Sequence, residues 1–225
     1  MPEDSPCAPR AVLWDMDGTL IDSAEYHWLA WQETMRRERY PITHADFMRS
    51  FGQRNDIVLC GYFGDDLPAS EIDRIAGFKE AEYRRLLRAG GIAFLPGAAD
   101  WIDRLRAAGW RQAVASSAPR ANVETVMEVL GAASLFDALV CGEDVERGKP
   151  DPQVFQVAAA ALGVPTERCV VVEDAPAGVE AAQRAGMAVI GVLTSHTALT
   201  TDLVVASLAD LPPGAFDALL AQRLA

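Results

Sequence analysis

Short apolar runs recur along the chain, each bounded by polar residues or glycine. Apolar and polar residues do not alternate within them, which is typical of strands buried on both faces of a parallel sheet. The predicted strands are Ala11–Trp14, Gln112–Ala115, Ala138–Val140, Cys169–Val172 and Ala188–Val192. Helical patterns separate them at Ala98–Ala108, Ala121–Leu130, Gln153–Leu162 and Ala175–Ala185. This order predicts an α/β fold with a parallel sheet and right-handed crossovers.

The alternation of strands and helices is broken once. Residues 22–91 follow the first predicted strand and have a helical pattern throughout. Ala24–Arg37 places its apolar residues on one face of a helix, and Ser70 is the expected N-cap of a second long helix. We therefore predict a helical domain at 22–91, inserted into a core that consists of residues 1–21 and 92–225.

The composition narrows the class of protein. The 225 residues are 50% hydrophobic and 23% charged, as in an ordinary globular protein. A formal net charge of −12 argues against nucleic acid as a partner, because such binding needs a basic surface. No apolar run is long enough to span a membrane, and residues 1–10 do not resemble a signal peptide. We expect a cytoplasmic protein; a monomer fits the sequence, which leaves the oligomeric state open.

The cysteines indicate neither a disulfide framework nor a zinc site. They are far apart and form no C-x-x-C pair: Cys7, Cys60, Cys141 and Cys169. This spacing is typical of incidental thiols in a reducing compartment.

Two carboxylates directly follow the first predicted strand. Asp15 and Asp17 stand two residues apart on extended chain, so both side chains can face one site at the carboxyl end of the strand. Close anionic groups repel each other, so their joint use requires a cation nearby. A calcium-binding EF-hand loop is excluded, because its sixth residue must be glycine and its twelfth glutamate, whereas here Gly18 is fourth and Tyr26 twelfth.

Further residues suited to phosphoryl transfer follow three other predicted strands. Ser116 and Ser117 come after the second strand, where a hydroxyl can bind a phosphoryl oxygen or cap a helix. Lys149 lies after the third strand, where an ammonium group can keep a carboxylate ionised, although a lone loop lysine is usually solvated. Glu173 and Asp174 end the fourth strand and offer the oxygen ligands that Mg²⁺ prefers.

In their order along the chain, these segments resemble the four motifs of the haloacid dehalogenase superfamily. The segments that carry the resemblance are Asp15–Thr19, Ser116, Gly148–Pro152 and Glu173–Gly178. The resemblance spans most of the chain. It implies a Rossmann-like core with an inserted α-helical cap domain, Mg²⁺ as cofactor, and a small phosphorylated metabolite as substrate.

The resemblance also implies a role for each residue. Asp15 would attack phosphorus to form an aspartyl-phosphate, and Asp17 would protonate the leaving alcohol and then activate water. Ser116 and Lys149 would bind the phosphoryl oxygens. The ligands of Mg²⁺ would be Asp15, the backbone carbonyl of Asp17, Glu173 and Asp174. Dehalogenases of this superfamily lack the second aspartate, so Asp17 indicates a phosphatase.

The helical domain resembles the cap of β-phosphoglucomutases and sugar-phosphate phosphatases. Gly52–Asn55 resembles the cap loop that contacts the substrate in that group. His27 would orient Asp17, or else be a hydrogen-bonded linker residue. Arg54, with Asn55 beside it, would bind a sugar hydroxyl or a second phosphate, or else lie on the surface. Together with Ser117, these are the candidate substrate-binding residues.

Hydrolysis and mutase activity differ in the need for a second phosphate site. The mutases of this group carry a serine and a lysine where this chain has Ala118 and Pro119, and only Arg120 offers a substitute. Ser50 stands where a mutase is expected to have lysine. We therefore predict Mg²⁺-dependent hydrolysis of a sugar or polyol phosphate; the alternative is a β-phosphoglucomutase-type sugar phosphate mutase. A binding module without activity is disfavoured, because unused buried acids cost stability.

Overall fold

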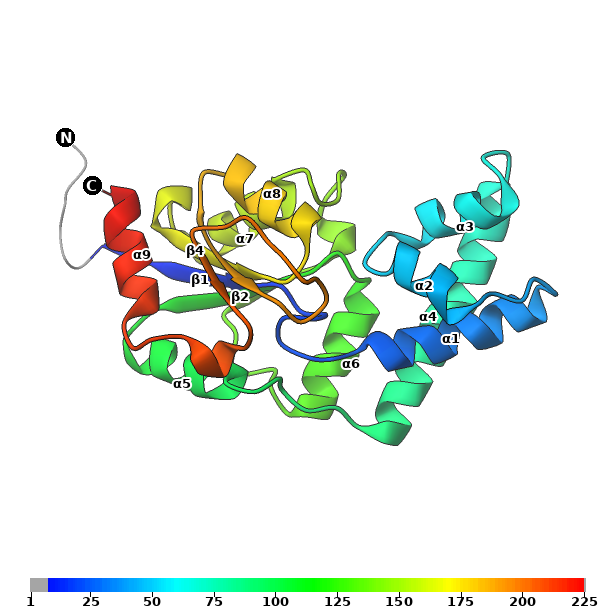
Figure 1. The fold of residues 1–225 in the computed structure, drawn as a ribbon, viewed down its shortest axis with the longest axis horizontal. Helices are drawn as coiled ribbons and strands as arrows, with labels where there is room; N and C mark the ends of the chain where they lie inside the picture. The colour runs from blue at the N-terminus through cyan, green and yellow to red at the C-terminus, as the bar shows by residue number, and fades with distance from the viewer. Residues whose placement is uncertain (1–7, 225) are drawn as a thin grey trace.

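A parallel sheet of six strands lies at the centre of the protein (Figure 1). The computed structural model describes residues 8–224. The strands are β1 (Ala11–Trp14), β2 (Arg111–Ala115), β3 (Ala138–Val140), β4 (Cys169–Glu173), β5 (Ala188–Val192) and β6 (Leu203–Val205). All five predicted strands are confirmed, with ends within one residue of the prediction. The strand β6 was not predicted, because three residues at a half-exposed edge carry too little pattern.

Neighbouring strands follow the order β3-β2-β1-β4-β5-β6, and every pair is parallel. This is the strand order of the Rossmann fold, so the predicted α/β fold with a Rossmann-like core is confirmed. The order reverses between β1 and β4. Ligands of open α/β sheets bind beyond the carboxyl ends of the strands at such a switch point, which places a candidate site at the ends of these two strands.

Helices connect the strands and form the insert. They are α1 (Ala24–Arg37), α2 (His44–Ser50), α3 (Asn55–Phe63), α4 (Ala69–Gly90), α5 (Ala98–Ala107), α6 (Arg120–Leu130), α7 (Gln153–Leu162), α8 (Pro176–Arg184) and α9 (Ala215–Leu224). Short 3₁₀-helices occupy Gly142–Asp144, Thr166–Arg168 and Leu208–Asp210. The four predicted core helices are confirmed to within one residue, and α9 was not predicted. Among residues 8–224, no helix has the length and apolar composition that crossing a membrane requires.

Alternate residues of the central strand pack into two apolar layers, one on each face of the sheet. Val12 and Trp14 of β1 contact the layer that α5, α6 and α9 cover, and Leu13 contacts the layer under α7 and α8 (Figure 1). The indole Nε1 of Trp14 donates to the side-chain oxygen Oε1 of Gln112 at 2.9 Å. The side-chain nitrogen Nε2 of Gln112 donates in turn to the backbone carbonyl of Ile102 at 2.9 Å. These buried polar groups therefore have hydrogen-bond partners, which join the two neighbouring strands β1 and β2 to α5.

Helices α1 to α4 form the insert, which has an apolar cluster of its own. The buried residues of this cluster are Trp31, Met35, Phe47, Val58, Leu59 and Ile75. The C-terminal half of α4 leaves the insert, because Tyr83 and Leu87 belong to the layer under α5, α6 and α9. The prediction that Ser70 caps α4 is wrong: α4 begins at Ala69 after Pro68, whose fixed φ of −59° suits a helix start.

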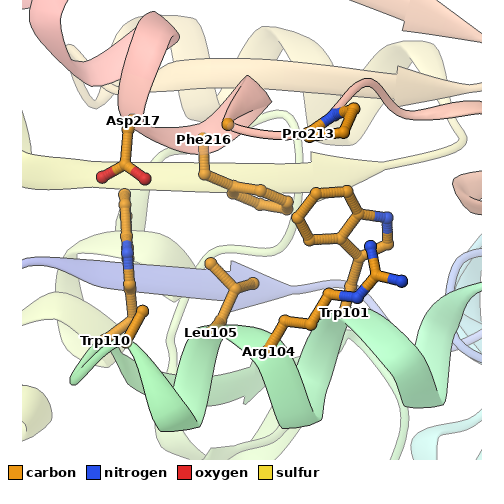
Figure 2. A pocket seen from close by; sticks show the side chains of 9 residues that line it. Trp101, Arg104, Leu105, Trp110, Pro213, Phe216 and Asp217 are labelled. Atoms are coloured by element: carbon orange, nitrogen blue, oxygen red, sulfur yellow. The ribbon is translucent and has the colours of Figure 1, made fainter.

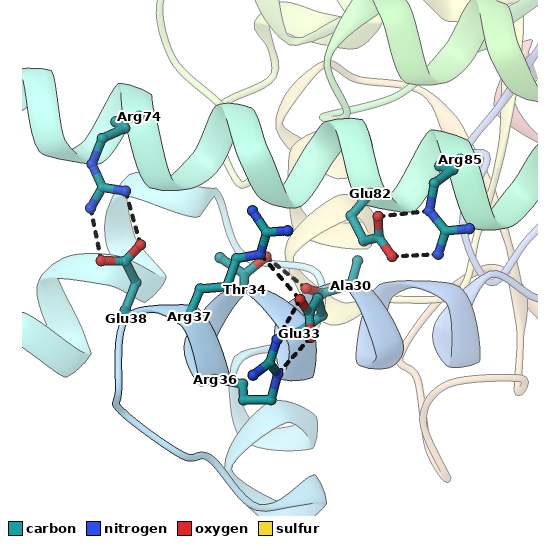
Figure 3. A network of polar contacts seen from close by, with 9 residues as sticks. All are labelled: Ala30, Glu33, Thr34, Arg36, Arg37, Glu38, Arg74, Glu82 and Arg85. Atoms are coloured by element: carbon teal, nitrogen blue, oxygen red, sulfur yellow. Dashed lines mark hydrogen bonds and ion pairs between the residues drawn. The ribbon is translucent and has the colours of Figure 1, made fainter.

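The outer faces of α1 and α4 carry ion pairs (Figure 3). Arg74 of α4 donates to both carboxylate oxygens of Glu38 at 2.9 and 2.8 Å, and Glu33 accepts from Arg36 and Arg37 of its own helix. Exposed pairs of this kind add little to stability, because water screens the charges and ordering the side chains costs entropy. The stability of the insert therefore depends mainly on its apolar cluster and much less on its surface ion pairs.

The cysteines agree with the prediction in the part of the chain that the structure describes. Cys60, Cys141 and Cys169 are free thiols, and Cys7 lies outside the described residues. Burial raises the pKa of Cys141 to about 11 and that of Cys169 to about 12. Both thiols are therefore neutral and unreactive at neutral pH.

Candidate active site

An ammonium group lies between two carboxylates at the switch point of the sheet. The Lys149 Nζ donates to Asp15 Oδ1 at 2.6 Å and to Glu173 Oε1 at 2.8 Å. Asp15 follows β1 and Glu173 ends β4, and these two strands are neighbours. Burial alone would lower the pKa of Lys149, whose side chain is 8% exposed, but the charges of Asp15 and Glu173 raise it above its usual range. The lysine is therefore charged.

Three buried carboxylates share this site. One oxygen each of Asp15, Glu173 and Asp174 lies within 4.8 Å of the others. Burial raises the pKa of Asp15 well above its usual range, and burial together with the charge of Glu173 raises the pKa of Asp174 to about 7. One ammonium group cannot balance three carboxylates. The surplus of negative charge and the all-oxygen donor set fit a hard divalent cation such as Mg²⁺.

The side chain of Asp17 lies outside this group of three acids. Its Oδ1 accepts a hydrogen bond from Ser23 Oγ and lies 3.7 Å from His27 Nε2. Burial would raise the pKa of Asp17, but His27 and Ser23 hold it below its usual range. The side chain of Asp17 thus lies apart from the acid cluster.

His27 is held by groups from the insert. The Lys79 ammonium lies 3.0 Å from His27 Nδ1, and the Tyr83 ring stacks on the imidazole with centroids 4.1 Å apart. Burial and the charge of Lys79 lower the pKa of His27, so the ring is neutral. Because an ammonium group can only donate, Nδ1 accepts and Nε2 carries the proton that faces Asp17.

Two other predicted residues, Ser116 and Arg54, lie near the strand ends and the loop of Lys149. Ser116, which follows β2, is buried, and its hydroxyl accepts from the Ala118 backbone at 3.0 Å, with Ser117 half-buried beside it. The Arg54 side chain is 47% exposed, and its Cδ lies 3.4 Å from the position a Cβ would take on Gly148. The predicted cap loop thus reaches the loop that carries Lys149.

The side chain of Asn55 contacts the long helix α4. Its amide nitrogen donates to Glu80 Oε1 of α4 at 2.7 Å. One N–H of the Asn55 amide is therefore engaged inside the insert. The substrate-binding role of Arg54 stays a prediction.

Several residues of the site were not predicted. Thr19 donates to Asp174 Oδ1 at 3.3 Å, and the ring of His196 lies 3.2 Å from the Asp174 backbone carbonyl. Lys79 is the clearest omission, because the sequence carries a signal for it: it interrupts the apolar stripe of α4 between Ile75 and Tyr83 at intervals of four residues. A buried lysine on an apolar helix face needs a partner.

A separate cavity lies away from these residues, between α5 and α9 (Figure 2). It encloses about 220 Å³ and is lined mainly by aromatic and aliphatic side chains, among them Trp101, Trp110 and Phe216. None of its lining residues follows the carboxyl end of a strand at the switch point. We assign it no part in the chemistry described above.

The model of the haloacid dehalogenase-like hydrolase family matches residues 9–186. The chain belongs to this family. It is 33% identical over 199 residues to validoxylamine A 7′-phosphate phosphatase of Streptomyces hygroscopicus subsp. limoneus, which covers 84% of this chain and 88% of that protein. It is 31% identical over 208 residues to β-phosphoglucomutase of Bacillus subtilis (strain 168), which covers 90% and 91%.

A solved structure is similar over most of this hydrolase. A mutant of CbbY from Rhodobacter sphaeroides in complex with xylulose-(1,5)bisphosphate matches with a TM-score of 0.83 and 28% identity, over 90% of this chain and 96% of that one. The predicted family, and with it the prediction of an enzyme, is confirmed.

A glycine makes room for one carboxylate of this hydrolase. A Cβ on Gly178 of α8 would lie 1.6 Å from Glu173 Oε1, the oxygen that accepts from Lys149. The other oxygen, Oε2, accepts from the backbone amides of Asp174 and Ala175 at 2.7 Å each. Glu173 is therefore held from both sides, in space that only glycine leaves open.

We expect Gly178→Ala to lower phosphate release by at least about tenfold and the free energy of unfolding by about 1–3 kcal/mol, because Glu173 must shift and Lys149 loses a partner. Assays of turnover and urea unfolding check this. Gly77→Ala is the matched control, since Gly77 lies exposed on α4 with nothing within 4 Å of an added Cβ. Wild-type behaviour of the Gly178 variant would contradict the assigned packing.

The raised pKa of Asp174 predicts how stability depends on pH. Its folded value of about 7 lies above the ordinary 3.8, so its contribution is present below pH 3.8 and is lost as pH rises through about 7. Without Mg²⁺, unfolding free energy should fall by about 2 kcal/mol between pH 5.5 and pH 8 from this group alone. Mg²⁺ should raise the melting temperature more at pH 8 than at pH 5.5.

Urea unfolding in EDTA and melting with and without Mg²⁺ measure both effects. Asp174→Asn should remove them, whereas Asp73→Asn, an exposed change on α4, should not. Equal Mg²⁺ stabilisation at the two pH values would show that Asp174 does not couple to the cation.

Proposed function

We propose that this hydrolase cleaves a small phosphomonoester, a sugar or polyol phosphate, in a Mg²⁺-dependent reaction through an aspartyl-phosphate. The observation that carries the proposal is the Lys149 ammonium held between Asp15 and Glu173 beside a third buried acid. Asp15, Glu173, Asp174 and the backbone carbonyl of Asp17 would hold Mg²⁺. When bound, the cation offsets the negative charge of the carboxylates and of the transferred phosphoryl group.

In the first step, an Asp15 carboxylate oxygen forms a bond to phosphorus as the bond between phosphorus and the ester oxygen breaks. Asp17 gives its proton to the leaving alcohol. Lys149 and Ser116 bind the phosphoryl oxygens, which is most of what phosphoryl transfer asks of a protein. A substrate phosphate adds negative charge near Asp17, and this charge raises the pKa of Asp17 toward the protonated form that the step needs.

In the second step, Asp17 takes a proton from water, the water oxygen bonds to phosphorus, and the bond to Asp15 breaks. Phosphate and the free Asp15 carboxylate result. His27 supports this step, because its Nε2 proton faces Asp17 and favours the ionised carboxylate. The low pKa of Asp17 in the free protein therefore fits the base that the second step requires.

The state of Arg120 favours hydrolysis over mutase activity. Its guanidinium donates to both oxygens of Asp144, at 2.7 and 2.5 Å, and its backbone amide donates to Glu143 at 2.8 Å. The candidate for a second phosphate grip is thus already paired. The name of the validoxylamine A 7′-phosphate phosphatase supports the same choice, while the β-phosphoglucomutase keeps the mutase as the alternative.

The placement of Arg54 supports a substrate with polar groups beyond its phosphate. Its side chain is 47% exposed and lies beside the loop of Lys149, and its Nε donates to Asp56 Oδ1 at 3.2 Å, which leaves the other N–H groups of the guanidinium for a substrate. The separate apolar cluster of α1 to α4 supports residues 22–91 as a cap domain over a core of residues 1–21 and 92–225. The cytoplasmic location stays a prediction.

We expect Asp15→Asn to lower Mg²⁺-dependent phosphate release by at least about 1,000-fold, because an amide cannot form the aspartyl-phosphate. A colorimetric phosphate assay across a panel of sugar and polyol phosphates measures this. Asp103→Asn, an exposed change on α5, is the matched control. Turnover retained by the Asp15 variant would rule out Asp15 as nucleophile. Conversion of β-glucose 1-phosphate to glucose 6-phosphate by wild-type protein, without phosphate release, would establish the mutase instead.

We expect Arg54→Ala to raise the KM for the best sugar phosphate by about tenfold or more, the worth of one charged hydrogen bond. The kcat/KM for p-nitrophenyl phosphate, which offers no hydroxyl groups to the cap, should change less than about threefold. Steady-state kinetics on both esters measure the split. Arg36→Ala, on the outer face of α1, is the control. An equal loss on both esters would contradict the role of Arg54 in recognising the distal part of the substrate.

A further inference from the structure

The Glu80 carboxylate collects hydrogen-bond donors from three elements. Glu80 lies on α4 and is 7% exposed. Its Oε1 accepts from Asn55 Nδ2, at the start of α3, at 2.7 Å and from Lys79 Nζ at 2.8 Å. Its Oε2 accepts from the side-chain amide of Asn122 on α6. A single buried group therefore joins the cap loop, the lysine that contacts His27, and a helix of the core.

Asn122 is held in one orientation. It is fully buried, and its amide oxygen accepts from Arg84 Nη1 at 2.8 Å while its amide nitrogen donates to Glu80. Glu80 and Arg84 lie one turn apart on α4, so the two ends of the Asn122 amide meet groups of opposite sense on the same helix. Turning the amide over would place donor against donor and acceptor against acceptor.

The contact between α4 and α6 contains further hydrogen bonds. One turn further along α4, Arg88 donates to Thr125 Oγ1 at 3.1 Å and to Glu128 Oε2 at 3.0 Å. Beside these contacts, Tyr83 and Leu87 of α4 pack into the apolar layer of the core. Apolar contacts tolerate sliding, whereas hydrogen bonds of defined sense specify one register between the helices.

The charge on Glu80 is retained in the interior. Burial would raise its pKa, but the charge of Lys79 and the hydrogen bonds from Lys79 and Asn122 lower it to about 2. A buried carboxylate is stabilised only when its lone pairs are satisfied, and here both oxygens have donors. A leucine at this position would pack as well but would hold none of the three donors.

We propose that Glu80 is a positioning residue for the reaction: through Asn122 it fixes the cap to the core, and through Asn55 and Lys79 it fixes the loop of Arg54 and the imidazole of His27. The inference rests on the function proposed above. It makes the seating of the cap and the orientation of the acid/base residue depend on the same carboxylate. Formation of the aspartyl-phosphate depends on Glu80 when the substrate needs a cap contact and a protonated leaving group. It does not depend on Glu80 when the substrate needs neither.

Exchanging the donor and the acceptor of the hydrogen bond between Asn122 and Glu80 tests the inference. Glu80→Gln puts an amide NH₂ opposite the NH₂ of Asn122, because the new carbonyl oxygen stays with Asn55 and Lys79. Asn122→Asp puts two carboxylates opposite each other. The double variant restores a donor opposite an acceptor, with the sense reversed, and Arg84 still has an oxygen to donate to.

We expect each single variant to lower kcat/KM for the best sugar phosphate by at least about tenfold, and the double variant to recover to within about threefold of wild type. The kcat/KM for p-nitrophenyl phosphate covers only the steps up to the departure of a leaving group that needs no proton, so it should stay within about threefold of wild type in every variant. Steady-state kinetics on both esters and melting temperatures of all four proteins give the answer. Glu82→Gln, which loses an exposed pair with Arg85 on the same helix, is the control.

Three outcomes would overturn the inference. Single variants as active as wild type on the sugar phosphate would show that Glu80 positions nothing. A double variant no better than the worse single would show that the Glu80–Asn122 pairing is not what matters. Equal losses on both esters, in step with the melting temperature, would show a structural role only; a single variant that fails to fold leaves the double to decide. If wild type hydrolyses neither ester, the proposed function fails instead.

Discussion

The Lys149 ammonium between Asp15 and Glu173 is the contact on which the candidate site depends. It donates to two of three buried carboxylates, and without it their mutual repulsion would favour protonation of the acids. Its geometry requires β1 and β4 to be neighbours and requires the bare backbone of Gly178 beneath Glu173. One ammonium group still leaves negative charge unbalanced, and this surplus is the physical argument for a divalent cation.

Residues of the insert, and not the acid cluster, contact the Asp17 carboxylate and lower its pKa. Its carboxylate turns toward Ser23 and His27, and His27 is in turn held by Lys79 and Tyr83 of α4. The proposed nucleophile and the proposed acid/base residue thus contact different parts of the protein. This division suits the proposed reaction, because Asp15 must be ionised when it attacks phosphorus, whereas Asp17 must gain and lose a proton.

The insert meets the core through two kinds of contact with different consequences. Its own apolar cluster keeps α1 to α4 together, and the apolar side of α4 anchors it to the core. The polar pairings of Glu80 and Arg84 with Asn122 add little net stability, since each buried charge also carries a desolvation cost. In the proposed function they contribute specificity of position, because a cap residue such as Arg54 must be held in place to contact a substrate.

The strands and helices of the core followed from the sequence, because apolar runs and helical spacing are local and each segment carries its own pattern. The grouping of Asp15 and Lys149 with the acids at the end of β4 also followed from the sequence, because the carboxyl ends of parallel strands share one edge of the sheet. The strand β6 was not predicted, because its apolar pattern is too short. The start of α4 after Pro68 was not predicted either, because the prediction placed the N-cap at Ser70. Asn55, Lys79, Glu80 and Asn122 acquired their partners only through packing, since the pairing of Glu80 with a residue 42 positions away depends on how α4 settles against α6. Local periodicity determines which residues are buried, but only tertiary structure decides which buried polar groups meet, because most such groups are satisfied by neighbours that sequence spacing does not bring together.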